Sequence, residues 1–296
     1  VGFLRGFYSP AQLPLMTMLV PREAYANSSA WNSTFWHIAV VVGSSIGGIL
    51  LALFGANAVY ILVVVLLFIG LIQVYRIPPQ PVQPSKIGES ISESIRQGLS
   101  FVFNNQMIFG AMLLDLIAVL FGGATAMLPV FASEVLHVGE SGFGILRAAP
   151  FVGSVLMALY MTKYPPLKNS GKKLLACVTG FSLCMIFFAL SKNFYLSFFI
   201  LVLSGAFDNV SVIIRSMIIQ FFTPDEMRGR VTSVSTMFIS SSNEIGAFES
   251  GFAAKLIGLV QSVVLGGGVA ILSVAGAYAW LPKLRKLDLH KEMNKP

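Results

Sequence analysis

The feature that most constrains this chain is a series of long apolar runs that carry few charges and end at short polar turns. A bilayer core takes about 20 mostly apolar residues per helix. Candidate runs lie at 1–20, 26–54, 56–75, 106–133, 140–162, 173–191, 194–222, 230–257 and 260–281. They alternate too weakly for the strands of an outer-membrane barrel, which are about ten residues long. The sequence therefore predicts an all-α membrane protein with about nine transmembrane helices.

Composition supports this class and argues against others. Charged residues make up 11% of the chain and hydrophobic residues 55%, whereas a soluble domain has about 25% charged residues. The net charge of +7 does not predict nucleic-acid binding, because the basic residues are spread over short loops rather than gathered on one face. Cys177 and Cys184 match no ligand or redox motif, and no cofactor-binding or metal-binding pattern is present. We expect no cofactor.

The loops predict an orientation, because cytoplasmic loops carry an excess of Lys and Arg. One set of connections comprises 21–25, 76–105, 163–172, 223–229 and the tail 282–296. With the adjoining helix starts it holds Arg22, Arg76, Lys86, Arg96, Lys163, Lys168, Lys172, Lys173, Arg228, Arg230, Lys283, Arg285, Lys286, Lys291 and Lys295. The connections on the other side hold only Lys192. We therefore expect the first set to be cytoplasmic.

An internal repeat links the two ends of the chain at an offset of 203 residues. Pro21 matches Pro224 and Glu23 matches Glu226 in corresponding loops. The same register pairs Gly2 with Gly205, Phe35 with Phe238, Gly43 with Gly246, Gly48 with Gly251, Leu53 with Leu256 and Gly55 with Gly258. Parallel repeats of this size are a known plan of membrane transporters. Two such bundles facing each other would create a cavity that rocking exposes to each side in turn.

The repeated cytoplasmic turn has two interpretations. Pro suits the first turn of a helix, and an acidic residue there opposes the helix dipole, so Asp225 and Glu226 can simply begin the next helix. Alternatively, Asp225 and Glu226 form a cytoplasmic charge latch with Arg228 and Arg230, which closes when the cavity faces outward.

The segment between the halves predicts a linker followed by a surface helix. YRIPPQPVQPSK, at 75–86, has four prolines in twelve residues and cannot continue a helix. In the following IGESISESIRQGLSFVF, apolar residues recur at near-helical spacing among charged ones. This pattern predicts an amphipathic helix on the cytoplasmic membrane face.

Four stretches in this order resemble the major facilitator superfamily, and more closely its bacterial enterobactin-exporter-like and macrolide-efflux-like branch. They are FYSPAQLPLMTMLVPREAYANSSA, IRQGLSFVFNN, GFGILRAAPFVGS and FFTPDEMRGRVTSV. The resemblance implies twelve helices, of which this chain holds the fourth to the twelfth, so we expect a C-terminal part of a longer protein. It also implies a bacterial cytoplasmic (inner) membrane location.

The same resemblance divides the chain. It implies a remnant of an N-terminal helix bundle at 1–75, a cytoplasmic linker with an amphipathic helix at 76–105, a C-terminal six-helix bundle at 106–282 and a cytoplasmic tail at 283–296. The second-half counterpart of the family's Gly–Asp–Arg-rich loop falls at 162–175. It keeps Gly171, Lys172 and Lys173 but lacks the acidic residue, which puts an ion-pair latch there in doubt.

Charges inside the predicted spans are the candidate functional residues, because intramembrane charges usually face a bundle interior or a wet cavity. They are Arg5, Asp115, Arg147, Asp208, Arg215, Glu244, Glu249 and Lys255. Asp115, Asp208 and Glu244 lie nearest the middle of their spans, and Asp115 or Asp208 is the candidate for proton coupling. The alternative is a fixed ion pair with Arg147 or Arg215 that only holds helices together.

The favoured function is a secondary transporter that exports an amphipathic small molecule, of the drug or siderophore class, by proton-coupled alternating access as a monomer. An interfacial membrane enzyme would require a cluster of catalytic polar residues at one membrane face, and the sequence contains none. A scaffold or sensor would be supported by a large soluble domain, but only residues 281–296 follow Trp280. Small molecules, protons and lipid are the expected partners.

Overall fold

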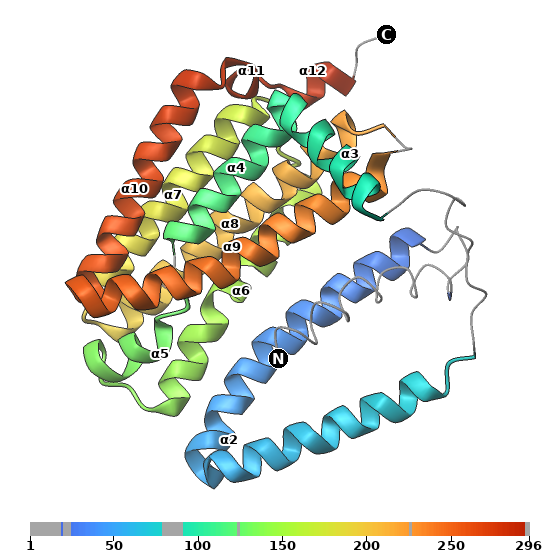
Figure 1. The fold of residues 1–296 in the computed structure, drawn as a ribbon. Helices are drawn as coiled ribbons and strands as arrows, with labels where there is room; N and C mark the ends of the chain where they lie inside the picture. Colours follow the sequence, from blue (N-terminus) through green and yellow to red (C-terminus); the bar gives the residue numbers. More distant parts are fainter. Residues whose placement is uncertain (1–18, 20–24, 79–90, 123–124, 225–226, 294–296) are drawn as a thin grey trace.

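The computed structural model describes residue 19 and residues 25–78, 91–122, 125–224 and 227–293, and within these the regular elements are helices (Figure 1). The first is the bent helix α2, Tyr25–Tyr75, whose two arms meet at Gly55. Gly55 has φ 74° and ψ 173°, a region open essentially to glycine alone. The predicted runs 26–54 and 56–75 are therefore two helical arms joined without a loop, while the predicted run 1–20 lies outside the described residues.

The second half of the chain is a packed helical bundle. Its long helices are α4 (Gln106–Phe121), α6 (Glu140–Lys163), α7 (Ser170–Leu190), α8 (Phe194–Phe222), α9 (Arg228–Ile257) and α10 (Leu259–Trp280). Two apolar clusters form the core. One surrounds Ile108, Leu174 and Ile214, and the other surrounds Phe131 and Phe188, whose ring centroids lie 5.0 Å apart.

One predicted run is not a continuous helix. The interpretation of 106–133 as a single span is wrong, because α4 ends at Phe121. Helical structure resumes as α5 (Leu128–Val130) and the π-helical turn η3 (Phe131–Val135). The sequence gives the reason: Gly122 weakens the helix at the break, and Pro129 suits the start of a new helix because it lacks a backbone N–H group.

The helices of the bundle approach closely at glycines. A Cβ atom on Gly153 would overlap the carbonyl oxygen of Val202, and one on Gly205 would overlap the carbonyl oxygen of Pro150. The Ser154 hydroxyl also donates to the Gly205 carbonyl oxygen at 3.0 Å. Small residues that let backbones approach are typical of membrane helix pairs, so α6 and α8 form one tightly joined layer.

The amphipathic helix expected in the linker lies at Ile91–Asn104 and is α3. It meets α4 at 96°. The turn between them is capped, because the Asn105 side-chain oxygen accepts hydrogen bonds from the backbone N–H groups of Met107 and Ile108 at 3.1 and 3.2 Å. An Asn cap of this kind begins a helix sharply, so α3 crosses the end of the bundle instead of extending α4.

The C-terminal tail is helical and packs on the bundle. It forms α11 (Pro282–Arg285) and α12 (Leu289–Met293), and Leu284, Leu287 and Leu289 are buried. The Gly171 N–H group donates to the Leu287 carbonyl oxygen at 3.1 Å, and the His290 N–H group donates to the Leu167 carbonyl oxygen at 3.2 Å. The tail therefore packs on the connection between α6 and α7 and is hydrogen-bonded to it.

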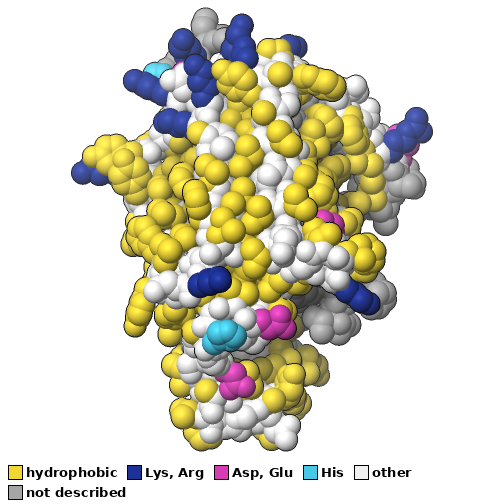
Figure 2. All heavy atoms as spheres, turned by 90° about the vertical axis from the view of Figure 1, so that its left-hand side faces the viewer, with side chains coloured by type: hydrophobic (Ala, Val, Ile, Leu, Met, Phe, Trp, Pro, Cys, Tyr) yellow, Lys and Arg dark blue, Asp and Glu magenta, His cyan; other side chains and the backbone are white. Residues whose placement is uncertain are grey.

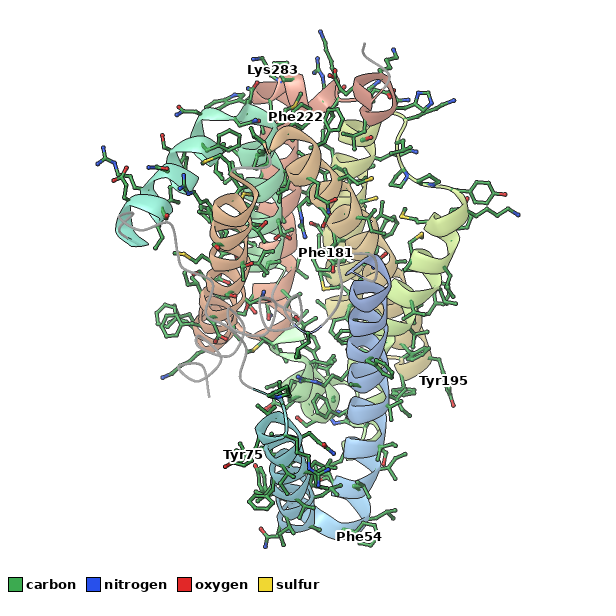
Figure 3. The ribbon with its side chains drawn as sticks, turned by 90° about the vertical axis from the view of Figure 1, so that its right-hand side faces the viewer. Phe54, Tyr75, Phe181, Tyr195, Phe222 and Lys283 are labelled. Atoms are coloured by element: carbon green, nitrogen blue, oxygen red, sulfur yellow. The ribbon has the colours of Figure 1, made fainter. Side chains whose placement is uncertain are left out.

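The side-chain distribution agrees with a membrane protein. Apolar side chains cover the middle of the face in Figure 2, and basic ones gather at the end that carries α11 and α12. We call this end, which also carries α3 and Lys283, the basic end (Figures 1 and 3). Five described helices are long and apolar enough to cross a membrane, or six if the α3–α4 pair is one span. The count of nine spans stays a prediction.

Candidate functional site

A buried ion pair joins α4 to α8. The Arg215 guanidinium donates from Nη1 to Oδ1 of Asp115, and only 8% of Arg215 and 6% of Asp115 is exposed. Asp115 lies in the middle of α4, and Arg215 lies two turns before the end of α8. Of the two partners that the sequence left open for Asp115, the structure places Arg215 beside it and does not place Arg147 there.

A second carboxylate belongs to the same charge cluster. Asp208 lies two helical turns before Arg215 on α8, and seven residues return a helix to the same face. It interacts electrostatically with both Arg215 and Asp115, and it is half-buried. One guanidinium thus serves two carboxylates, so the three charges do not cancel when both acids are ionised. We call Asp115, Asp208 and Arg215 the charge cluster.

A small cavity adjoins the charge cluster, and α9 closes it. Its lining, besides Asp115 and Arg215, consists of Met112, Ile219, Ser235, Phe238, Ile239 and Ser242. Its volume of about 10 Å³ is close to the minimum that holds one water molecule. Ser235 and Ser242 are polar lining residues that were not predicted from the sequence. Their signal was their seven-residue spacing on α9, which puts both on one helix face.

An unpartnered amide follows Asp208 in the chain. Among the described residues, the side-chain oxygen of Asn209 is buried without a hydrogen-bond partner. An unmade hydrogen bond in an apolar interior is costly, so such an atom marks a place where a water molecule or a ligand would be stabilised. Its sequence neighbour Asp208 is the half-buried member of the charge cluster.

Two further candidate charges, Glu244 and Arg147, stay apart from the cluster. Glu244 is exposed on α9. Arg147 is exposed on α6, and its Cζ atom lies 6.0 Å from the ring centroid of Phe143. Among the described residues, neither Arg147 nor Glu244 forms an ion pair.

The predicted cytoplasmic latch lies at the basic end. Asp225, Glu226 and the Arg228 side chain lie outside the described residues. Arg230 donates from Nη1 to the side-chain oxygen of Gln97 on α3, and also approaches the Met227 sulfur at 3.6 Å. The structure thus connects Arg230 to the amphipathic helix, a contact that the sequence did not predict, because a lone Gln carries no pairing signal.

At the opposite end, α2 and α6 cross closely. A Cβ atom on Gly48 would lie 2.7 Å from the Glu140 carbonyl oxygen and 3.0 Å from the Gly144 Cα atom. This contact joins the first arm of α2 to the start of α6, on the side of the molecule that carries Phe54 (Figure 3). The first arm is therefore fixed to the bundle near its Gly55 end.

The order of helices, the paired bundles implied by the repeat and the charges within the spans together point to a transporter family. The model of the transmembrane secretion effector family matches residues 5–295. The chain belongs to this family of the major facilitator superfamily.

Known members of the superfamily are similar across nearly the whole chain. The MFS-type transporter YfmI of Bacillus subtilis is 24% identical over 98% of this chain and 73% of its own length. The enterobactin exporter EntS of Escherichia coli O1:K1 is 26% identical over 92% of this chain and 65% of its own length. The chain thus spans about two thirds of the exporter's length. The family consists of multi-pass membrane transporters and not of enzymes.

A solved structure shares the fold. It is a bacterial homologue of the human lysosomal transporter Spinster, in an inward-facing and unoccupied conformation. The TM-score is 0.66 at 16% sequence identity, and the match covers 91% of this chain and 73% of that one. Similarity at this level concerns the fold, and the family assignment rests on the sequence.

Proposed function

We propose that this member of the family is a proton-coupled exporter of small amphipathic molecules that works by alternating access, as a monomer in the bacterial inner membrane. The observation that carries the proposal is the charge cluster. Asp115 has Arg215 as a direct partner, whereas Asp208 shares that cation from two turns away. Of the two candidate aspartates, Asp208 is therefore the proton-binding group that the geometry favours.

The cluster connects proton binding to helix movement. Its members come from α4 and α8, and α9 walls the adjoining cavity. A proton on Asp208 would remove one negative charge near Arg215 and strengthen the pairing of Arg215 with Asp115. Loss of that proton would draw Arg215 towards both acids. Protonation thus changes the forces between the helices, which is what coupling requires, because a ligand shifts a conformational equilibrium through its differential interaction with the two states.

The end contacts fit the same mechanism. Gly48 and Gly144 hold α2 against α6 at the end opposite the basic end. Because cytoplasmic loops carry the excess of Lys and Arg, the basic end is assigned to the cytoplasm. The described arrangement would then be closed towards the outside. EntS is named as an enterobactin exporter, which supports export as the direction and a siderophore or drug as the substrate class.

The experiment is substrate-dependent proton flux through the protein, expressed from its full reading frame and reconstituted in liposomes. Ethidium, 2-naphthoate and 2-naphthamide supply a cationic, an anionic and a neutral amphipathic probe. We expect at least one probe to move protons. We also expect Asp208→Asn to retain probe exchange while losing accumulation driven by a proton gradient.

Two results would contradict the proposal. One is accumulation by Asp208→Asn that equals that of the parent. The other is the absence of proton movement with all three probes. The matched control is Glu134→Gln, which removes an exposed acid in η3, outside the charge cluster, and should leave both activities unchanged.

A further inference from the structure

Arg147 faces away from the side of α6 that is suited to lipid. Ile145, Leu156 and Leu159 are exposed apolar residues of α6 and mark the lipid-type face. At about 100° per residue, Arg147 lies about 200° from Ile145 and about 180° from Leu156 around the helix. The guanidinium therefore projects from the opposite side of the helix, and it is nevertheless exposed.

The neighbours of Arg147 define where that side faces. Three residues before it, Gly144 lies against Gly48 of α2. Three residues after it, Pro150 lies against Gly205 of α8. Arg147 thus occupies the strip of α6 between its contact with α2 and its contact with α8. It lies about one helical turn further along α6 than the Gly48–Gly144 crossing.

A cation in this place requires a counter-charge. An Arg in the membrane interior is costly, and such residues are usually paired. Arg215 has Asp115, but Arg147 has no acidic partner among the described residues. Its observed neighbour is the Phe143 ring. A charge within a candidate span that is exposed and has no acidic partner among the described residues is available to a ligand.

We propose that Arg147 binds the acid group of the transported molecule, so that the substrate is an amphipathic organic carboxylate carrying an aromatic ring. The guanidinium offers a planar pair of donors that matches a carboxylate, and the Phe143 ring beside it offers a surface for an aromatic group. This inference rests on the proposed function and deepens it.

The position also explains how the site changes sides. Arg147 lies just inside the crossing of α2 and α6, so separation of Gly48 from Gly144 would open it towards the end opposite the basic end. While the crossing stays closed, access to Arg147 from that end would be restricted. The same cation would then meet the substrate's acid group in both states of the cycle.

Binding of 2-naphthoate and its neutral analogue 2-naphthamide tests the inference without requiring transport. Isothermal titration of the protein in lipid nanodiscs, with empty nanodiscs subtracted, gives the two affinities. We expect Arg147→Gln to weaken 2-naphthoate binding about tenfold or more, as loss of a hydrogen-bonded charge does, and to leave 2-naphthamide binding unchanged. Arg147→Lys should retain only part of the affinity, because it keeps the charge but loses the planar pair of donors.

A matched control and a second measurement separate the alternatives. Lys255→Gln removes another exposed cation from a span, on α9, and should change neither affinity. Thermal unfolding of each variant checks folding, which an exposed Arg147 should not affect. Equal 2-naphthoate binding by the parent and Arg147→Gln overturns the inference, and so does a parent that does not bind 2-naphthoate. Arg147-dependent binding without proton flux would instead uphold the anion site and reject the proton-coupled mechanism.

Discussion

The chain contains two copies of one helix–turn–helix unit, and they differ in what surrounds them. The first copy is α2, and the second is α9 with α10, at an offset of 203 residues. Both turn at a glycine with positive φ, Gly55 at 74° and Gly258 at 95°. The helices α9 and α10 pack on α4 and α7, whereas α2 contacts the bundle through α6. No residue of 56–75, the second arm of α2, is buried.

The two copies also differ in chemistry. On α9 the span carries Glu244, Glu249 and Lys255, and the same register in α2 places apolar residues at those positions: Val41, Ile46 and Ala52. The α9 copy walls the cavity beside the charge cluster. The repeat thus supplies the same scaffold twice, but only the second copy carries charges in its described span and borders the charge cluster, whose own members lie on α4 and α8. A fold is shared more readily than a site.

The largest expected effect comes from breaking the ion pair between Asp115 and Arg215, which lies beside α9 of the second copy. Arg215→Met leaves the Asp115 carboxylate buried without its partner. We expect a loss of about 3–5 kcal/mol in the free energy of unfolding, measured by denaturant titration in detergent micelles. The double variant Asp115→Leu with Arg215→Met removes both charges and should recover most of that loss. A single variant that stays within about 1 kcal/mol of the parent would contradict burial of the pair.

The paired turns give the next largest effect. Gly55→Ala and Gly258→Ala both force a side chain into a backbone region that costs about 1–3 kcal/mol. The two costs should be similar, because nothing lies within 4 Å of a Cβ atom on Gly55, and the atom 2.5 Å from one on Gly258 is the end of the exposed, flexible Gln261 side chain, which can move away. The same denaturant titration measures both. If either change is neutral, the two turns are not equivalent.

A smaller effect distinguishes the matched glycines Gly48 and Gly251. A Cβ atom on Gly48 would press on the α6 backbone, whereas one on Gly251 would meet only the Met127 methyl group at 3.7 Å. Gly251→Ala should raise the free energy of unfolding by about 0.5–1 kcal/mol, because Ala favours a helix more than Gly does. Gly48→Ala should give no such increase, because the added Cβ atom overpacks the contact with α6. A cysteine cross-link between the first arm of α2 and α6 would report whether Gly48→Ala separates them. Equal effects at both positions would contradict the close crossing.

The helices were predictable from sequence to the extent that length and hydropathy define a span. The observed bounds of α6, α8 and α10 lie close to the predicted runs. The runs of α6 and α8 end at polar residues that the membrane excludes, and α10 begins directly after Gly258. The prediction of one span at 106–133 was wrong because mean hydropathy over a window does not detect a break in the helix. Gly122 and Pro129 interrupt the helix without interrupting the apolar composition.

The site was predictable as a set of residue types but not as a set of pairs. Charges within the spans selected Asp115, Asp208 and Arg215, because any charge there is costly. The choice of Arg215 over Arg147 as the partner of Asp115 depends on how α4, α6 and α8 pack, which a single sequence does not encode locally. The docked tail was missed for the same reason, since its three buried leucines carry no periodic signal in so short a segment.

The smallest expected effect concerns the tail that follows the second copy and packs on the α6–α7 connection. The described residues of α2 include no such segment. Asp288 accepts hydrogen bonds from the backbone N–H groups of Asn169 at 3.1 Å and Lys291 at 3.2 Å. The bond from Asn169, and then that from Lys291, hold the pKa of the Asp288 carboxyl below its ordinary value of 3.8. Asp288 thus joins the α6–α7 connection to the first turn of α12.

Because the pKa of Asp288 is lower in the docked tail, its contribution to docking is present above pH 3.8 and is lost as the pH falls through the lowered value. The measurement is the fluorescence of a probe on a cysteine at position 291, which changes when the tail leaves the bundle. We expect the parent tail to be docked at pH 7 and to loosen below about pH 4, near the ordinary Asp pKa. Asp288→Asn should loosen the tail slightly at pH 7 and remove this pH dependence, whereas Glu292→Gln should retain it. A pH dependence that survives in Asp288→Asn would assign the effect to another acid.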